Sequence, residues 1–342
     1  MQHLLKPASV KAHSSIVSGV AMSARTAPIK VGARKVITRR GFLKFAGGSF
    51  LSLASLSAYA VGIEPMLLTH VKRYRLTPPH WPAGLKLRVV ALADIHACRP
   101  WMTPERIASL VEGANVLQPD LIVLLGDYIS GMSLVTNRVE AHEWAPALSG
   151  LKAPLGVLSI LGNHDWWHDP FAQQAGAGPT VARKALEEAG ISVLENDTVR
   201  LEKNGYGFWI AGLADQLALL PNKAAGRDKF KGLDDLDGTL AKITDQAPII
   251  LLAHEPDIFP KVPWRVSLTL SGHTHGGQVR LFGYSPVVPS RFGNRFAYGH
   301  VVENDRNLIV SGGLGFSIAP VRFGMRPEIL QIDLGLGMPV FR

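Results

Sequence analysis

Residues 87–96 read LRVVALADIH, a largely apolar run that stops at two polar residues, Asp94 and His96. A short run of this kind is typical of a buried strand. Four more apolar runs end in polar residues in the same way, at 121–127 (LIVLLGD), 157–165 (VLSILGNHD), 249–254 (IILLAH) and 267–275 (SLTLSGHTH). Because the carboxyl ends of strands form the functional edge of an α/β sheet, we expect these polar side chains to meet at one site.

Helical patterns alternate with these runs in the first half of the chain. Thr103 and Pro104 begin one helix as N-cap and first helical residue, and Gly190 ends a second helix at 180–189. Further apolar runs predict short strands, at 192–195, 199–202, 207–211, 248–253 and 266–270. After Gly299, strand-like segments are joined by Asn-Asp and Gly-rich turns. The order of these elements predicts a layered α/β domain with mixed sheets.

The polar residues after the runs are of the types that bind a pair of metal ions. Oxygen and imidazole ligands suit Mn²⁺, Fe or Zn²⁺, and Cys98 is the single thiol of the chain. The two carboxylate oxygens of Asp127 allow it to bridge two ions, and ions about 3.5–4 Å apart can share a hydroxide and hold a phosphoryl group. One histidine after a strand is usually a structural residue, but five such motifs in order favour a metal site.

These motifs resemble those of the calcineurin-like metallophosphoesterase superfamily over residues 87–334. The motifs are DIH at 94–96, GD at 126–127, GNHD at 162–165, His254, and GHTH at 272–275. The stretches GHTHGGQVRL, PSRFGNRFAYG and PVRFGMRPEI resemble the bacterial branch that is exported by the twin-arginine route. The resemblance implies a four-layer αββα sandwich of two mixed β-sheets, with a dinuclear metal site at the strand ends.

The resemblance also implies a role for each residue of the site. The metal ligands would be Asp94, His96 and His275 for the first ion, Asp127 as the bridge, and Asn163, His254 and His273 for the second ion. His164 would be a catalytic residue beside the phosphate that helps the leaving oxygen to depart. We expect Asp165 to be its catalytic partner, which orients the His164 ring and favours its charged form.

The expected reaction is hydrolysis of phosphodiester bonds, and also of phosphomonoesters, by attack of a metal-bridging hydroxide. Ser130 stands where relatives carry an Asp or an iron-binding Tyr, which argues against the iron–tyrosinate subclass. Two divalent ions per chain are expected, and the sequence leaves Mn, Fe and Zn open. A non-catalytic, envelope-associated metal-binding protein is the alternative. The His164-Asp165 pair favours an enzyme, because metal storage does not need it.

The net charge of +9 belongs to the N-terminal segment. Residues 1–44 contain nine Lys and Arg and no acidic residue, which leaves 27 Lys and Arg against 27 Asp and Glu in the rest. The remainder of the chain is therefore formally neutral, and we expect no nucleic-acid partner.

Residues 38–44 read TRRGFLK and precede an uncharged run at 45–63, a pattern that resembles a twin-arginine export signal. It implies the twin-arginine translocation machinery as a partner and an extracytoplasmic location, in the periplasm or at the outer face of the cytoplasmic membrane. Cleavage after Ala60 and retention as a membrane anchor are both open, since the run would span about 28 Å as a helix. The predicted organisation is residues 1–63 as extension and signal or anchor, with Met22 as an alternative start, and 64–342 as the phosphoesterase domain.

Export favours an envelope, lipid or sugar phosphate as the substrate. Trp166 and Trp167 directly follow the GNHD motif, and residues 282–289 form an apolar loop soon after GHTH. These side chains could contact a lipid-linked substrate or the membrane at the mouth of the site, although core packing explains them equally well.

Overall fold

The computed structural model of the protein describes residues 38–336. The predicted N-terminal extension up to residue 37, including Met22, lies outside the described residues, as do residues 337–342. The chain divides into two compact units, residues 1–50 and 51–342. The described part of the first unit is residues 38–50, which include the beginning of helix α1 (Arg39–Ala58).

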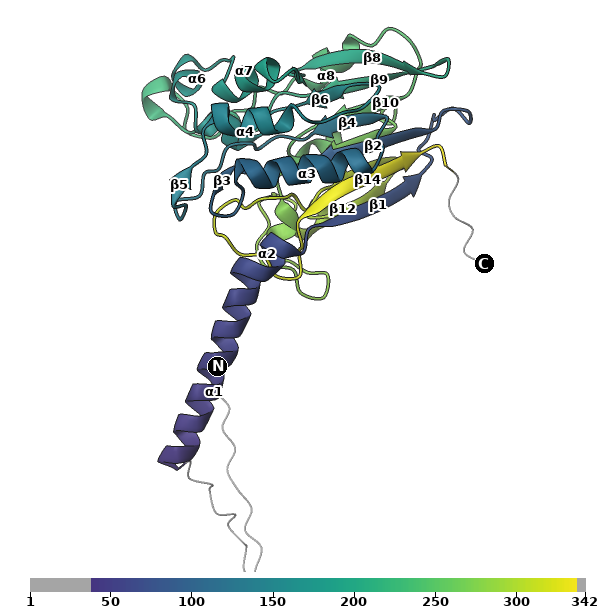
Figure 1. The fold of residues 1–342 in the computed structure, drawn as a ribbon. Helices are drawn as coiled ribbons and strands as arrows, with labels where there is room; N and C mark the ends of the chain where they lie inside the picture. The colour runs from purple at the N-terminus through teal and green to yellow at the C-terminus, as the bar shows by residue number, and fades with distance from the viewer. Residues whose placement is uncertain (1–37, 337–342) are drawn as a thin grey trace, which may run out of the picture. The chain divides into compact units, whose positions relative to one another are not determined.

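The first sheet is mixed and is formed by both ends of the second unit. Across the sheet, its strands are β1 (His70–Leu76), β14 (Glu328–Leu334), β2 (Leu87–Leu92), β4 (Leu121–Leu124), β6 (Val157–Ser159) and β7 (Ser192–Val193). Strands β2, β4, β6 and β7 are parallel, and β14 pairs antiparallel with β2. Because β2, β4 and β6 are parallel, their carboxyl ends lie together on the same side of the sheet (Figure 1).

The second sheet is also mixed and has six strands. Across the sheet, they are β12 (Gly299–Glu303), β13 (Arg306–Val310), β11 (Leu268–Ser271), β10 (Ile249–Leu252), β9 (Tyr206–Gly212) and β8 (Asp197–Lys203). The four central strands are parallel, and the two edge strands are antiparallel to their neighbours. The predicted Asn-Asp turn joins β12 to β13, with positive φ at both Asn304 and Asp305.

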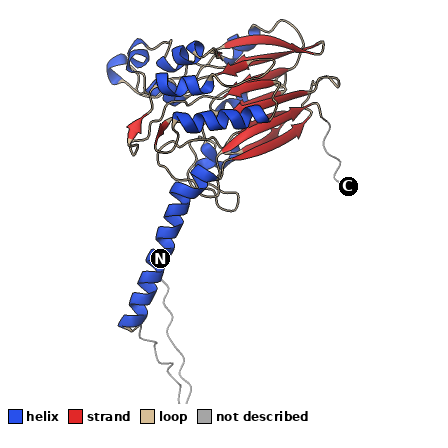
Figure 2. Ribbon diagram, viewed as in Figure 1, coloured by secondary structure: helices blue, strands red, loops and turns tan. Residues whose placement is uncertain are grey.

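The two sheets pack face to face between layers of helices, as Figure 2 shows. Alternation along β2 explains the layering. Val89 and Ala91 pack into the core between the sheets, whereas Val90 and Leu92 pack under the outer helices. Those helices are α3 (Pro104–Val116), α4 (Ala141–Leu148) and α7 (Val181–Glu188). The third core, on the far face of the second sheet, contains Leu236 and Phe259 from α8 (Leu236–Ala241) and η3 (Pro256–Lys261). The predicted αββα arrangement of two mixed sheets is confirmed.

Short elements complete the domain. They are a two-stranded sheet of β3 (Cys98–Arg99) and β5 (Asn137–Arg138), helices α5 (Asn163–Trp167) and α6 (Pro170–Ala175), and 3-10 turns at Lys223–Ala225, His275–Gly277 and Gly293–Phe296. The predicted N-cap Thr103 is present and accepts a hydrogen bond from the backbone N–H three residues ahead. Thr180, predicted as the first residue of its helix, is the N-cap and accepts the same kind of hydrogen bond. Strand β1 does not follow from the sequence pattern, because HVKRYRL contains three basic residues and only one buried residue, Leu76.

Helix α1 continues through a π-helical turn at Tyr59–Ile63 into α2 (Glu64–Leu67). The continuous segment Arg39–Leu67 is long and apolar enough to cross a membrane. The hydrophobic side chains of α1 are exposed, as Leu51 and Phe50 illustrate. This segment fits the predicted signal or anchor.

Candidate metal centre

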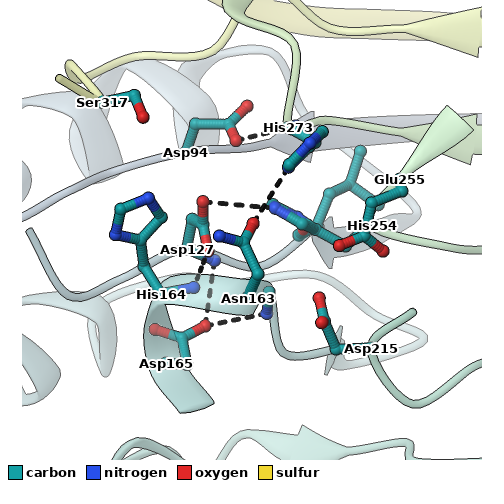
Figure 3. A network of polar contacts seen from close by, with 12 residues as sticks. Asp94, Asp127, Asn163, His164, Asp165, Asp215, His254, Glu255, His273 and Ser317 are labelled. Carbon is teal, nitrogen blue, oxygen red and sulfur yellow. Dashed lines mark hydrogen bonds and ion pairs between the residues drawn. The ribbon is translucent and has the colours of Figure 1, made fainter. Parts of the chain in front are cut away.

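The polar residues after the strands converge at the shared edge of the two sheets (Figure 3). Two groups of potential ligand atoms each lie within 4.8 Å of one another: Asp94, His96 and His275, and Asp127, His254 and His273. Asp127 Oδ2 lies 3.4 Å from His96 Nε2 and 3.2 Å from His254 Nε2. One carboxylate therefore contacts both groups, which is the arrangement expected of a bridging ligand.

Backbone strain is concentrated at the same residues. Five of them have a positive φ, namely Asp94 (54°), His96 (46°), Asp127 (59°), His273 (69°) and His275 (52°). Each non-glycine residue in this region costs about 1–2 kcal/mol, and such residues gather at functional sites. The strained turns end the strands abruptly and direct the side chains toward one another.

Gly162 permits a close approach between two of the strand ends. A Cβ atom at this position would collide with Asp127 Oδ1 and with His254 Cε1. Only glycine therefore allows the GNHD loop to pack against both residues without displacing them.

Gly162→Ala should weaken metal binding about 10- to 100-fold, because it displaces Asp127 and His254 without removing either ligand. Titration against a competing chelator measures the affinity. Gly113→Ala is the matched control, since its added Cβ would lie 3.6 Å from Ile329 Cδ1, an ordinary contact. Equal affinities for the two variants would contradict the close approach at Gly162.

The donor atoms fit divalent cations. His96 Nδ1 donates to Ile129 O (3.0 Å) and His254 Nδ1 donates to Leu125 O (2.6 Å), so the Nε2 lone pairs of both rings are directed into the site. His254 Nε2 and Asp94 Oδ2 are buried and have no hydrogen-bond partner among the described residues. Buried polar atoms without partners are costly, and a cation would satisfy both of these. The second group has a further oxygen donor, Asn163 Oδ1, 2.9 Å from His273 Nδ1.

Burial sets the charge states in the site. It lowers the pKa of His96 to about 4 and the pKa of His164 to about 3, so both rings are neutral near pH 7. Burial alone would raise the pKa of Asp127, but His254 and His164 beside it hold that pKa well below its usual range. Burial alone would lower the pKa of His254, but the Asp127 carboxylate raises it well above its usual range. Metal binding requires the deprotonated carboxylate and a neutral His254, so a cation would displace the proton from this ring.

His164 lies beside both ligand groups but makes a different set of contacts. Its ring packs edge-on against His96 at 4.8 Å between centroids, and its backbone N–H donates to Asp127 Oδ1 (2.8 Å). Its Nδ1 lies 3.2 Å from Nε2 of His168, one turn further along the chain. His168 would be expected from the sequence to be a solvated loop residue near the site, but it caps α5 four residues after His164, a spacing at which two side chains meet.

Asp165 does not have the role that the sequence suggested. Both carboxylate oxygens accept hydrogen bonds from backbone N–H groups, those of Asp127 (2.9 Å), Tyr128 (2.8 Å), Ile129 (3.1 Å) and Gly162 (2.9 Å). The prediction that it orients the His164 ring is therefore wrong. Asp165 instead fixes the loop that carries Asp127, so it is a positioning residue.

The site also contains a pair of buried acidic residues that the sequence motifs did not reveal. Asp215 and Glu255 lie with His254 in a third group of potential ligands. Glu255 Oε2 accepts from the backbone and side-chain N–H groups of Gln216 (both 3.2 Å), whereas Asp215 Oδ2 has no partner among the described residues. Asp215 follows the end of β9 by three residues, so the pattern of apolar run and polar residue does occur there.

A cavity of about 420 Å³ adjoins the second ligand group. Its wall includes His273, the apolar side chains of Trp167, Leu217 and Pro289, and the cation Arg291. Trp167 is held in place because its indole N–H donates to Leu217 O (2.8 Å). Trp166, by contrast, is buried in the core and cannot contact a ligand there.

The sequence of this chain is similar to those of known metallophosphoesterases. The calcineurin-like phosphoesterase family profile matches residues 87–277. An uncharacterized metallophosphoesterase of Bacillus subtilis is 32% identical over 310 residues, which is 88% of this chain and 98% of that protein. A zebrafish protein called transmembrane protein with metallophosphoesterase domain is 30% identical over 256 residues, 72% of this chain and 53% of its own length. A dimetal phosphatase structure from zebrafish, 12% identical, has a TM-score of 0.36 and covers 72% of this chain and 98% of that one.

The family profile spans more than half of the chain, and it includes every predicted metal ligand from Asp94 to His275. The Bacillus relative matches along almost its whole length. This chain belongs to the calcineurin-like phosphoesterase family and is a metal-dependent phosphoester hydrolase.

Proposed function

We propose that this phosphoesterase hydrolyses phosphodiester bonds outside the cytoplasm and that its substrate is an envelope, lipid or sugar phosphate. The observation that carries the proposal is the pair of ligand groups that share Asp127, with His164 at their edge. A non-catalytic metal-binding protein would need the ligands but not a half-buried, neutral imidazole beside them.

The proposal places two cations among these residues. Asp94, His96 and His275 would hold one divalent ion, Asn163, His254 and His273 would hold the other, and Asp127 would contact both. When bound, such a pair of ions polarises a phosphoryl group and lowers the pKa of coordinated water. Nitrogen and oxygen donors of this kind accept Mn²⁺, Fe²⁺ or Zn²⁺.

His164 is the side chain of this protein that would stabilise the leaving oxygen. With His168 as donor in the contact between the two rings (3.2 Å), the proton of neutral His164 is on Nε2. From there it can donate a hydrogen bond to an oxygen that gains charge as the ester bond breaks, and the ring itself stays neutral. Asp165 contributes indirectly, because it holds the backbone of Asp127 in place.

The cavity beside His273 would take the group attached to the phosphate. Its volume of about 420 Å³ suits an organic substituent, and its wall combines apolar side chains with Glu255, Asp257 and Arg291, which suits a substituent with both apolar and polar parts. A diester offers a substituent on each side of the phosphorus, which is why we favour diesters.

Location outside the cytoplasm is supported by the N-terminal segment. Arg39 and Arg40 begin the apolar helical segment Arg39–Leu67, which fits a signal read by the twin-arginine translocation machinery or a retained anchor. The zebrafish relative is itself called a transmembrane protein.

Purified, metal-loaded protein should hydrolyse bis-p-nitrophenyl phosphate faster than p-nitrophenyl phosphate, because only the diester places an organic group on both sides of the phosphorus. Steady-state values of kcat/KM for the two compounds provide the comparison. Faster cleavage of the monoester would refute the preference for diesters. No cleavage of either compound, with two ions bound per chain, would favour the metal-binding alternative.

A further inference from the structure

We propose that an apolar turn surface, formed by Leu281, Phe282, Tyr284, Val287 and Ile318, inserts into the headgroup region of an anionic membrane. All five side chains are exposed among the described residues. This proposal concerns a surface outside the metal centre and does not depend on which phosphoester is hydrolysed.

The geometry of the turn presents Phe282 to the outside. Leu281 and Tyr284 exchange two backbone hydrogen bonds (2.8 and 2.9 Å), which close a two-residue turn at Phe282 and Gly283. Both turn residues have a positive φ, 50° and 84°. Glycine suits this conformation, but phenylalanine does not, and its ring is fully exposed. A strained and solvent-exposed aromatic residue at the tip of a turn is unfavourable in water and is expected where a lipid phase receives it.

A second loop adds to the same surface and is firmly attached to it. The Gln278 side-chain amide donates to Ala319 O and Val321 O (both 2.9 Å) and accepts from Ser317 N (2.8 Å). Ile318 lies between these anchoring points and is 81% exposed. The two loops therefore present their apolar side chains from one supported framework.

The surface adjoins the end of the apolar N-terminal segment. Arg280 N donates to Phe323 O (2.8 Å), which joins the turn to residues 322–325. On those residues, the Phe323 ring contacts the Tyr59 ring edge-on, with 6.0 Å between centroids. The buried Glu64 carboxylate accepts hydrogen bonds from the N–H groups of Gly324 (3.1 Å) and Met325 (2.7 Å). All these contacts lie within the unit of residues 51–342.

The position of the surface therefore indicates that a membrane covers it. The segment Arg39–Leu67 is long and apolar enough to cross a membrane, and its C-terminal end is bonded to the loop that supports the turn. A membrane reached by this segment would meet the turn next to the point where the chain leaves the bilayer.

Charge near the surface matches an anionic membrane. Residues 258–302 contain no Asp or Glu. Arg280 and the exposed Arg326 form no ion pair with any residue in the described part of the chain. Unpaired cations beside exposed apolar and aromatic side chains are the combination by which surface segments bind anionic lipids.

The test places an environment-sensitive fluorophore on single cysteines in the full-length protein, in vesicles of phosphatidylcholine and phosphatidylglycerol. The variants carry Cys98→Ala, which removes the native buried thiol, and either Phe282→Cys or Val287→Cys. Val116→Cys is the matched control, an exposed apolar position at the far end of α3. Thermal melting identifies the variants that fold, and Val287→Cys replaces Phe282→Cys as the turn probe if Phe282→Cys does not fold.

A turn probe should shift its emission to the blue, and spin-labelled lipids should quench it several-fold more than the Val116 probe. Equal, water-like emission at both positions would overturn the proposal. A turn probe that is shielded in detergent without lipid and cross-links to a second chain would also overturn it, because the surface would then bind another copy. No substrate is used, so a failure of the proposed diester hydrolysis would leave this result interpretable.

Discussion

Asp127→Asn is expected to reduce turnover of a diester by about 1,000-fold or more and to lower the metal content below two ions per chain. The carboxylate lies 3.4 Å from His96 and 3.2 Å from His254, so its charge serves both cation positions. Asparagine retains one oxygen that can accept the His164 N–H, so we expect the loop to keep its conformation. Elemental analysis of the dialysed protein, together with the diester assay, measures both effects.

The matched control for this charge removal is Asp197→Asn. Asp197 is an exposed carboxylate on β8 that pairs with Lys242 on the surface, at 3.1 Å. It should leave metal content and turnover unchanged. Two ions per chain and nearly normal turnover in Asp127→Asn would show that this carboxylate does not bridge.

His164→Ala is expected to lower kcat about 100- to 10,000-fold while both ions stay bound. The side chain is assigned to a hydrogen bond to the leaving oxygen rather than to metal binding, and its contact with Asp127 is made by the backbone, which alanine keeps. The loss should be larger for an alkyl ester than for a p-nitrophenyl ester, because the oxygen of a poor leaving group gains more charge and depends more on the hydrogen bond.

His142→Ala is the control, since this exposed histidine on α4 lies outside the ligand groups of the described residues. Loss of one ion in His164→Ala would instead identify His164 as a ligand, a reading that its place in a group with His96 and Asp127 also permits. An equal loss for good and poor leaving groups would contradict a hydrogen bond from His164 to the leaving oxygen.

The strands that bear the site could be predicted because each is a short, nearly continuous apolar run buried on both faces. Strand β1 could not, because three basic residues interrupt its pattern and its partner β14 lies at the other end of the described chain. Pairing of this kind is fixed by tertiary structure, and a local pattern does not reveal it.

The convergence of the candidate ligands could be predicted from their order after these strands, but the contacts that hold them in place could not. Asp165 binds backbone N–H groups, which leave no trace in the sequence. Arg322, which follows a Pro-Val pair near the C-terminus, is fully buried and donates to the carbonyl groups of Gly312, Gly315 and Met325. Its guanidinium Nη2 also lies 3.3 Å from His275 Nδ1, so it supports the loops around a predicted ligand.

Family membership and the two-sheet fold are confirmed, whereas export, the substrate and the identity of the metal stay predictions. The apolar segment Arg39–Leu67 agrees with a signal peptide and with an anchor alike, because both need a helix of this length and composition. The substrate depends on groups that fill the cavity beside His273, and a lining of both apolar and charged residues admits several of them.

Anomalous diffraction from crystals of the manganese-loaded protein tests the bridging role of Asp127 most directly. We expect two peaks about 3.5–4 Å apart, with one Asp127 oxygen within coordinating distance of each. The first should also contact His96 and His275, and the second His254 and His273. A single peak, or two peaks of which only one contacts Asp127, would contradict a dinuclear site.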